Sequence, residues 1–379
     1  MGWYGDPTIS WSVLLQATLA AHVSADAVAS RLADLVIRYP HLGAPPTVLA
    51  ADGSRWPAVC ASFADEPYSA GAPLLRVAVD AGGTNGGRLL VAAHHGATDG
   101  LGLLAVLAAA LGADLVSRAR GIADRPPSSV FLASATRCLA EALVRPPARI
   151  APSMRRAGGA RCGGDILVCA ELPARGADSA GADSAGSDSA GAAGAAGAVS
   201  AAALTAATSR AAQEWNARHR APYRRAVAGL GVSRRVGDRA TPVADSAFLR
   251  LRLPRSADTA TVRGLIAAQP PEPNFPRSRS AAPAVLTRLL ASRLGSTFLA
   301  SNLGIVDGPA EVRLLAFYPT ASGRSGIAVG AVTIDRVTTV TLRARRTSFD
   351  HASAAALLNM IVTHLGASAS TAISPLTGI

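Results

Sequence analysis

The sequence predicts a mixed α/β protein, of α+β character, with two lobes of similar size. The chain has 379 residues, which at roughly 150 residues per domain is too long for one ordinary core. Strand-like and helix-like patterns are mixed in both halves. Between them, residues 174–198 are almost entirely Ala, Gly, Ser and Asp, and such a tract buries too little apolar surface to offset its ordering entropy. We therefore expect an N-terminal lobe over residues 1–173, a linker over 174–198 and a C-terminal lobe over 199–379.

In the N-terminal half, apolar periodicity switches between the strand and the helix patterns. Val28, Leu32 and Leu35 have the spacing of one helix face, and that helix must stop before Pro40. The glycine-rich segment 81–87 joins two apolar runs in the manner of a hairpin. The expected elements are strands at Thr8–Ala20, Leu74–Val79, Arg88–His94 and Asp165–Leu172, and helices at Ser24–Arg38, Gly100–Leu111 and Val130–Val144.

The C-terminal half begins with a helix and continues mainly with strands. The expected helices are Ser200–Arg220, Ala257–Ala268, Ala284–Leu294 and His351–Leu365. The expected strands are Ala247–Leu253, Thr297–Ser301, Val312–Tyr318, Gly326–Ile334 and Thr338–Arg345.

The net charge of +12 first suggests a nucleic-acid partner, because clustered cations displace counterions from phosphates. The cations are all arginines, however, and they are scattered among Ala, Gly and Pro without interleaved aromatic residues. We therefore expect no nucleic-acid binding. A local arginine surface for an acidic partner or a phosphate-bearing cofactor remains open.

The four cysteines, Cys60, Cys138, Cys162 and Cys169, have neither C-x-x-C spacing nor the density of a disulfide scaffold. The N-terminus lacks the basic and apolar regions of a signal peptide, and no segment has about 18 uninterrupted apolar residues. We expect a cytoplasmic protein that is not embedded in a membrane.

The segment His94-His95-Gly96-Ala97-Thr98-Asp99-Gly100 carries the clearest functional signal. It places two histidines at a strand end and an aspartate at the mouth of a helix. Two structural interpretations compete with a functional one, because Asp99 is well placed as a helix N-cap and a lone histidine at a strand end is more often structural than catalytic. A metal site is disfavoured, since adjacent strand residues such as His94 and His95 point to opposite faces. The alternation instead predicts one histidine in a cleft and the other packed behind it.

The spacing His94-His95-x-x-x-Asp99-Gly100 resembles the HHxxxDG signature of the chloramphenicol-acetyltransferase-like superfamily, which includes nonribosomal-peptide condensation domains, polyketide-associated acyltransferases, wax-ester synthases and plant acyl-CoA transferases. Further segments resemble pieces of the same fold: Pro73–Val77, Ser301–Gly304, Leu342–Arg345 and Phe349-Asp350. The resemblance implies two lobes in a V shape with an active-site tunnel between them.

The resemblance also implies roles for individual residues. His95 would act as the catalytic general base or position the acceptor, with His94 packed behind it. Asp99 would pair with an arginine and hold the loop, while Gly100 would give the backbone room. Condensation domains usually keep that arginine where this chain has Gly43, so Arg76 is a possible substitute. Ser301 and Asn302 would contact the substrate or its oxyanion. No metal ligand is implied.

The reaction implied is acyl transfer by a stand-alone enzyme of specialised metabolism. An amine or alcohol acceptor would attack an acyl thioester on phosphopantetheine, carried by an acyl or peptidyl carrier protein or by coenzyme A. We expect no bound cofactor and a monomer. The alternative is a relative without acyl transfer, which binds a carrier-tethered intermediate and promotes its cyclisation or docking.

Overall fold

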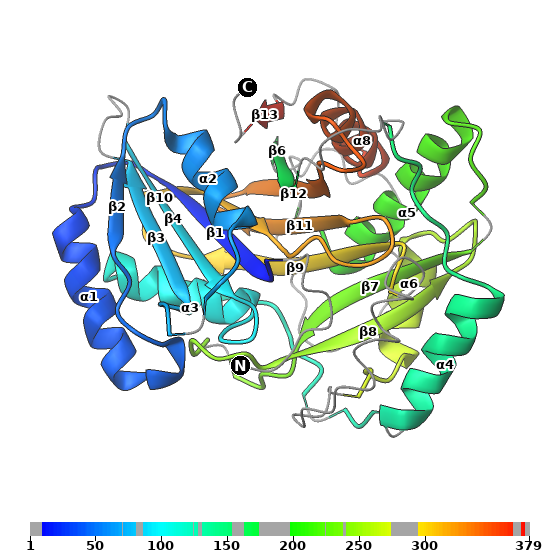
Figure 1. Ribbon diagram of the computed structural model, residues 1–379, viewed down its shortest axis with the longest axis horizontal. Helices are drawn as coiled ribbons and strands as arrows, with labels where there is room; N and C mark the ends of the chain where they lie inside the picture. The colour runs from blue at the N-terminus through cyan, green and yellow to red at the C-terminus, as the bar shows by residue number, and fades with distance from the viewer. Residues whose placement is uncertain are drawn as a thin grey trace.

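The structure is a computed structural model. It contains two β-sheets and the helices that cover them (Figure 1). The residues described are 10–69, 71–80, 86–123, 125–127, 131–153, 163–173, 198–223, 225–237, 240–273, 295–366 and 373–375. The predicted helix over residues 284–294 lies outside this part of the chain, as does nearly all of the predicted linker over 174–198. The prediction of a mixed α/β fold is confirmed.

The first sheet has five strands in the order β10-β1-β4-β3-β2. All neighbours in it are antiparallel except β2 and β3, which are parallel. Its strands are β1 (Ser12–Leu19), β2 (Val48–Ala51), β3 (Leu75–Asp80), β4 (Gly87–His94) and β10 (Val312–Tyr318). The helices that follow its strands are α1 (Ala25–Arg38), the short 3-10 helix Pro40–Leu42, α2 (Trp56–Asp65) and α3 (Gly100–Leu111).

Both faces of the first sheet are buried, which the alternation along β1 makes visible. Leu15 packs into a core with α1 and α3. Leu14, its neighbour, points to the opposite face and joins a second core with α2, centred on Trp56. A strand covered on both faces reads as a continuous apolar run, and the segment Val13–Leu15 has that character.

The second sheet has eight strands, with the order β13-β6-β12-β11-β9-β7-β8 and β5 paired to β9. Its strands are β5 (Val116–Ser117), β6 (Asp165–Pro173), β7 (Ala226–Ser233), β8 (Ser246–Leu253), β9 (Phe298–Asp307), β11 (Ile327–Ile334), β12 (Val337–Arg345) and β13 (Ile373–Pro375). The remaining helices are α4 (Phe131–Val144), α5 (Ala201–Arg218), α6 (Thr259–Ala268) and α8 (His351–His364). Residues of α5, α6 and α8 share one large core with this sheet.

The two sheets exchange strands across the predicted lobe boundary. Strand β6 precedes residue 174 but pairs with β12 in the second sheet. Strand β10 belongs to the C-terminal half but pairs with β1 in the first sheet. The division at residues 173 and 199 therefore does not separate the sheets. Figure 1 shows the first sheet with α1, α2 and α3 on one side of the molecule, and the second with α4, α5, α6 and α8 on the other.

Helix starts follow the capping residues. The side chains of Ser24, Ser200 and Asp350 each accept a hydrogen bond from a backbone N–H in the first turn of α1, α5 and α8. Among the residues described, no helix combines the length and apolar character needed to cross a bilayer.

Candidate active site

His95 lies directly after the last residue of β4, next to the first residues of β1. Its backbone N–H donates to the carbonyl of Trp11 at 2.8 Å, which continues the β1–β4 pairing past His94. Its ring Nδ1 lies 3.3 Å from the carbonyl oxygen of Thr98. A carbonyl can only accept, so this contact assigns the hydrogen to Nδ1 and leaves the lone pair on Nε2. In this tautomer Nε2 is the hydrogen-bond acceptor of the half-buried imidazole.

His94 has a different environment from its neighbour. Its Nδ1 accepts a hydrogen bond from the Gly96 N–H at 3.1 Å, and the Tyr68 ring meets it edge-on at 5.4 Å between centroids. Burial, followed by the nearby charge of His95, lowers the pKa of His94. His94 therefore packs against Tyr68, while the orientation of His95 into a cleft stays a prediction.

Asp99 caps α3 and also binds residues of the connection between β7 and β8. Its Oδ1 accepts from the Gly102 N–H at 2.8 Å, which is the N-cap bond of α3. Arg235 donates to Oδ1 at 2.9 Å and to Oδ2 at 3.0 Å, and the Asp245 N–H donates to Oδ2 at 2.8 Å. The carboxylate is buried and accepts four hydrogen bonds from three nitrogen atoms, one of them in the Arg235 guanidinium that balances its charge.

The arginine partner comes from the connection between β7 and β8. The guanidinium of Arg235 also donates to the Val243 carbonyl at 2.6 Å and the Thr241 carbonyl at 3.2 Å. It therefore fixes its own loop while it binds Asp99. The sequence contains no local signal for this pairing, since Arg234 and Arg235 stand among many other arginines and lie far along the chain from the motif.

The prediction that Arg76 pairs with Asp99 is wrong. Arg76 donates to the carbonyls of Glu66 at 2.7 Å and Pro67 at 2.9 Å, and its guanidinium lies 4.0 Å above the Tyr68 ring. Because Tyr68 contacts His94, Arg76 supports the packing histidine. Residue 76 lies in β3, where its side chain reaches the segment that follows α2 and does not reach the start of α3.

The glycines of the motif helix are required by close neighbours. A Cβ on Gly100 would lie 2.8 Å from side-chain atoms of both Leu303 and Phe317, which belong to β9 and β10. A Cβ on Gly102 would lie 2.6 Å from the Val243 carbonyl. The start of α3 is thus in contact with both sheets and with the β7–β8 connection.

Ser301 and Asn302 lie next to each other on β9 but differ in what surrounds their side chains. Asn302 donates from Nδ2 to the Val199 carbonyl at 2.7 Å and accepts at Oδ1 from the Gly304 N–H at 2.8 Å, so both ends of its amide bind backbone. Ser301 is half-buried and pairs with Gly330 on β11 and Gly231 on β7, neither of which has a side chain to cover it. The Asn302 amide is thus occupied by backbone partners, whereas the paired positions on both sides of Ser301 are glycines.

No protein-family model and no curated protein match this sequence. Solved structures do match. The first condensation domain of the calcium-dependent antibiotic synthetase, in complex with a substrate analogue, has a TM-score of 0.58 at 14% identity over 98% of this chain and 95% of that one. The starter condensation domain of rhizomide synthetase, in complex with C8-CoA, has a TM-score of 0.56 at 14% identity over 98% and 92%. SgcC5 from Streptomyces globisporus has a TM-score of 0.51 at 13% identity over 94% and 92%. The two sheets and their helices thus have the arrangement that these proteins share, and the chain has the chloramphenicol-acetyltransferase-like fold of condensation domains.

Proposed function

We propose that the protein is an acyltransferase of the condensation type, with His95 as its general base. The observation that carries this proposal is the contact of His95 Nδ1 with the Thr98 carbonyl, which leaves the basic lone pair on Nε2. The same loop is fixed by Asp99 and Arg235. An imidazole with a defined tautomer on a fixed loop is the arrangement that positioned acid–base catalysis requires.

In the proposed reaction His95 accepts one proton and later donates it. Nε2 accepts the proton of the acceptor's hydroxyl or amine as its oxygen or nitrogen bonds to the thioester carbonyl carbon. The carbonyl oxygen becomes an oxyanion, for which the Ser301 hydroxyl is our candidate donor. The carbon–sulfur bond then breaks, the sulfur receives the proton from Nε2, and an ester or amide and a free thiol remain. The acyl donor in this proposal is carried on phosphopantetheine and reaches His95 through a tunnel between the lobes.

The pairing of Asp99 with Arg235 bears on the competing function. The absence of an arginine at Gly43 is what favours a relative that cyclises or merely docks its ligand. Arg235 supplies a charged partner for the same carboxylate from another part of the chain, with its Nη1 donating to both carboxylate oxygens. This removes the reason to expect a disabled loop and supports acyl transfer.

Carrier proteins are acidic, and the excess of arginine gives the chain a charge of +12 that would attract them over long range. Two neighbours of the same fold were solved with ligands described as a substrate analogue and as C8-CoA. We propose a carrier protein as the physiological donor for this chain, with coenzyme A thioesters as the competing donor.

The test is transfer from a panel of acyl thioesters, offered on a carrier protein, on coenzyme A and on pantetheine, to amine and alcohol acceptors. Release of free thiol and formation of the acylated acceptor are measured for the parent, for His95→Ala and for His22→Ala. His22 is an exposed histidine outside the motif and serves as the matched control. Thiol release that depends on the acceptor and on His95 but not on His22 is the expected result. Equal rates in all three proteins would overturn the assignment of His95.

A further inference from the structure

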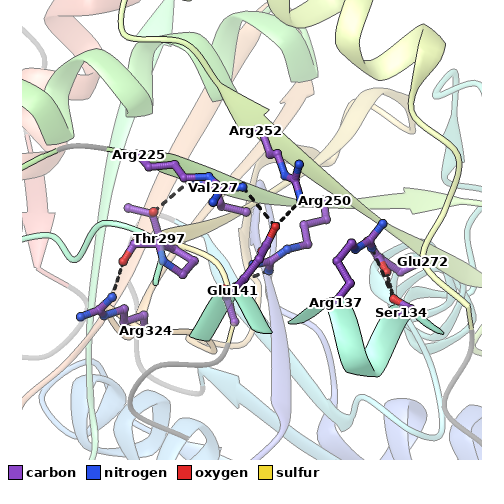
Figure 2. A network of polar contacts seen from close by, with 12 residues as sticks. Ser134, Arg137, Glu141, Arg225, Val227, Arg250, Arg252, Glu272, Thr297 and Arg324 are labelled. Atoms are coloured by element: carbon purple, nitrogen blue, oxygen red, sulfur yellow. Dashed lines mark hydrogen bonds and ion pairs between the residues drawn. The ribbon is translucent and has the colours of Figure 1, made fainter. Parts of the chain in front are cut away.

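An open cavity of about 390 Å³ lies at the C-terminal end of α4, against the face of β8 opposite the main core. Arg137, Arg145, Arg225 and Arg252 line it together with Glu141. Figure 2 shows the side chains of Arg225 and Arg252 directed toward the Glu141 carboxylate, while Arg137 points to Glu272 and Ser134.

The sequence of β8 explains why arginines gather here. The run Leu249-Arg250-Leu251-Arg252-Leu253 alternates, so its leucines enter the core with α5 and its two arginines share the opposite face. Helix α4 covers that face, and it places Glu141 above the two arginines. The pattern is therefore a strand with one apolar and one cationic face.

The Glu141 carboxylate accepts hydrogen bonds from three guanidinium groups. Glu141 Oε2 accepts from Arg250 at 2.8 Å, while Oε1 accepts from Arg225 at 3.1 Å and from Arg252. Burial works to raise the pKa of Glu141, but the hydrogen bonds and charges of Arg250 and Arg252 outweigh it and lower the pKa, so the carboxylate stays ionised. This carboxylate leaves two positive charges uncompensated.

Of the two remaining arginines of the cavity, only Arg145 adds to that excess of positive charge. Arg137 is neutralised by Glu272. Arg145 is exposed and has no ion pair with any described residue. The whole set thus contains five arginines and two glutamates. A structural tie between α4 and β8 needs only one arginine, and Arg250, which is buried with Glu141, already supplies it.

We propose that this cavity is a binding site for a phosphate-bearing ligand. Guanidinium groups have five N–H donors in a planar fork that matches phosphate oxygens in pairs. The Glu141 carboxylate uses only part of the donor capacity of Arg225 and Arg252, and it holds both heads at the cavity before any ligand arrives. Such preorganisation lowers the entropy lost on binding.

The site is separate from the transfer centre. Asp245 contacts Asp99 at the start of β8, and Arg252 lies seven residues further along the strand. At about 3.3 Å per residue the separation along β8 is about 23 Å. The proposal therefore does not depend on the acyl-transfer function, and substitutions in the cavity leave the reacting groups in place.

The experiment measures binding of pyrophosphate by calorimetry to the parent, to the double variant Arg145→Gln/Arg252→Gln and to Arg218→Gln. Arg145 is exposed and Arg252 is 56% exposed, and Arg225 and Arg250 continue to neutralise Glu141 in the double variant. The control, Arg218, is an exposed arginine on α5 that pairs with Glu214 one turn away. We expect the double variant to weaken binding by about tenfold or more, because two charged donors are lost, and the control to bind like the parent.

Coenzyme A, pantetheine and poly-glutamate then separate the sources of the anion. Coenzyme A that binds in the same variant-dependent way, while phosphate-free pantetheine does not, assigns the site to the nucleotide phosphates of a donor. Binding of pyrophosphate but not of coenzyme A assigns it to a small free phosphate compound. The proposal is overturned if pyrophosphate fails to bind, if it binds the double variant as well as the parent, or if poly-glutamate binds more tightly than pyrophosphate through the same arginines.

Discussion

Arg235 donates two hydrogen bonds to the carboxylate of Asp99 across 136 residues of chain, and both side chains are almost fully buried. The pair joins the start of α3 to the β7–β8 connection. Its consequence is that the loop carrying His95 is held by a residue of the other half of the chain.

Removing Arg235 should therefore destabilise the whole protein. Arg235→Ala leaves the Asp99 charge buried with only backbone and cap donors, and breaking a buried pair in this way costs about 3–5 kcal/mol. Loss of an N-cap alone costs about 1 kcal/mol. Chemical denaturation of Arg235→Ala and of Ser24→Ala, a cap with no ion pair, would compare the two. A loss in Arg235→Ala no larger than in Ser24→Ala would show that the pair contributes little.

His95→Ala should separate activity from stability. Its half-buried ring contacts the backbone carbonyl of Thr98 and is not part of a buried apolar core. We expect the melting temperature to stay near that of the parent while transfer falls by about 10²- to 10⁴-fold. A variant with most of its activity would contradict the general-base role.

Gly100→Ala should be costly because its added Cβ would lie 2.8 Å from the side-chain ends of Leu303 and Phe317, which are themselves buried and have little room to move away. Overpacking of this kind costs about 1–3 kcal/mol. Gly264→Ala in α6 is the matched control, since nothing lies within 4 Å of a Cβ there and alanine is about 1 kcal/mol better than glycine inside a helix. Thermal unfolding should therefore show opposite shifts for the two substitutions. Shifts of the same sign would contradict the close contact at Gly100.

The carboxyl group of Asp65 makes the stability of the folded protein depend on pH. Burial, and then the charge of Asp165, raises the pKa of Asp65 from its ordinary range to about 6. A carboxyl whose pKa is higher in the folded protein stabilises it at low pH, and that contribution is lost as the pH rises to about 6. Asp65→Asn keeps the acceptor for the Asp165 N–H, which lies 2.8 Å away. It should raise the melting temperature at pH 8 and change it little at pH 4. The exposed Asp34→Asn should show no such difference, and an Asp65→Asn gain of equal size at both pH values would contradict the raised pKa.

The elements with strong periodicity were predictable and the weaker ones were not. Helix α3 and strand β4 fall on the predicted ranges because their apolar runs are long and bounded by Asp99 and by glycines. Strand β7 was missed because its sequence, AVAGLGVS, has low strand propensity. The structure shows why glycine is needed there: a Cβ on Gly229 would lie 2.2 Å from the Phe248 ring. Short elements such as α2 and β2 were also missed.

The motif residues could be found from the sequence, but their partners could not. The spacing from His94 to Gly100 is local and can be recognised in one segment. The contacts of Asp99 with Arg235 and of Asn302 with Val199 join segments that only the tertiary structure brings together. Nothing in the spacing of arginines distinguishes the one that reaches Asp99 from the one that packs on Tyr68.

The exchange of β6 and β10 between the sheets determines when the protein can fold during its synthesis. The first sheet lacks its β10 edge until the residues up to Tyr318 have left the ribosome. The β12 neighbour of β6 emerges later still. Strands β1 and β6 therefore each have an unpaired edge while most of the chain is translated. Exposed strand edges of this kind favour association with other chains. A bound chaperone would therefore protect this chain more than one whose lobes are contiguous in sequence, and slow translation would lengthen the time for which the edges are exposed.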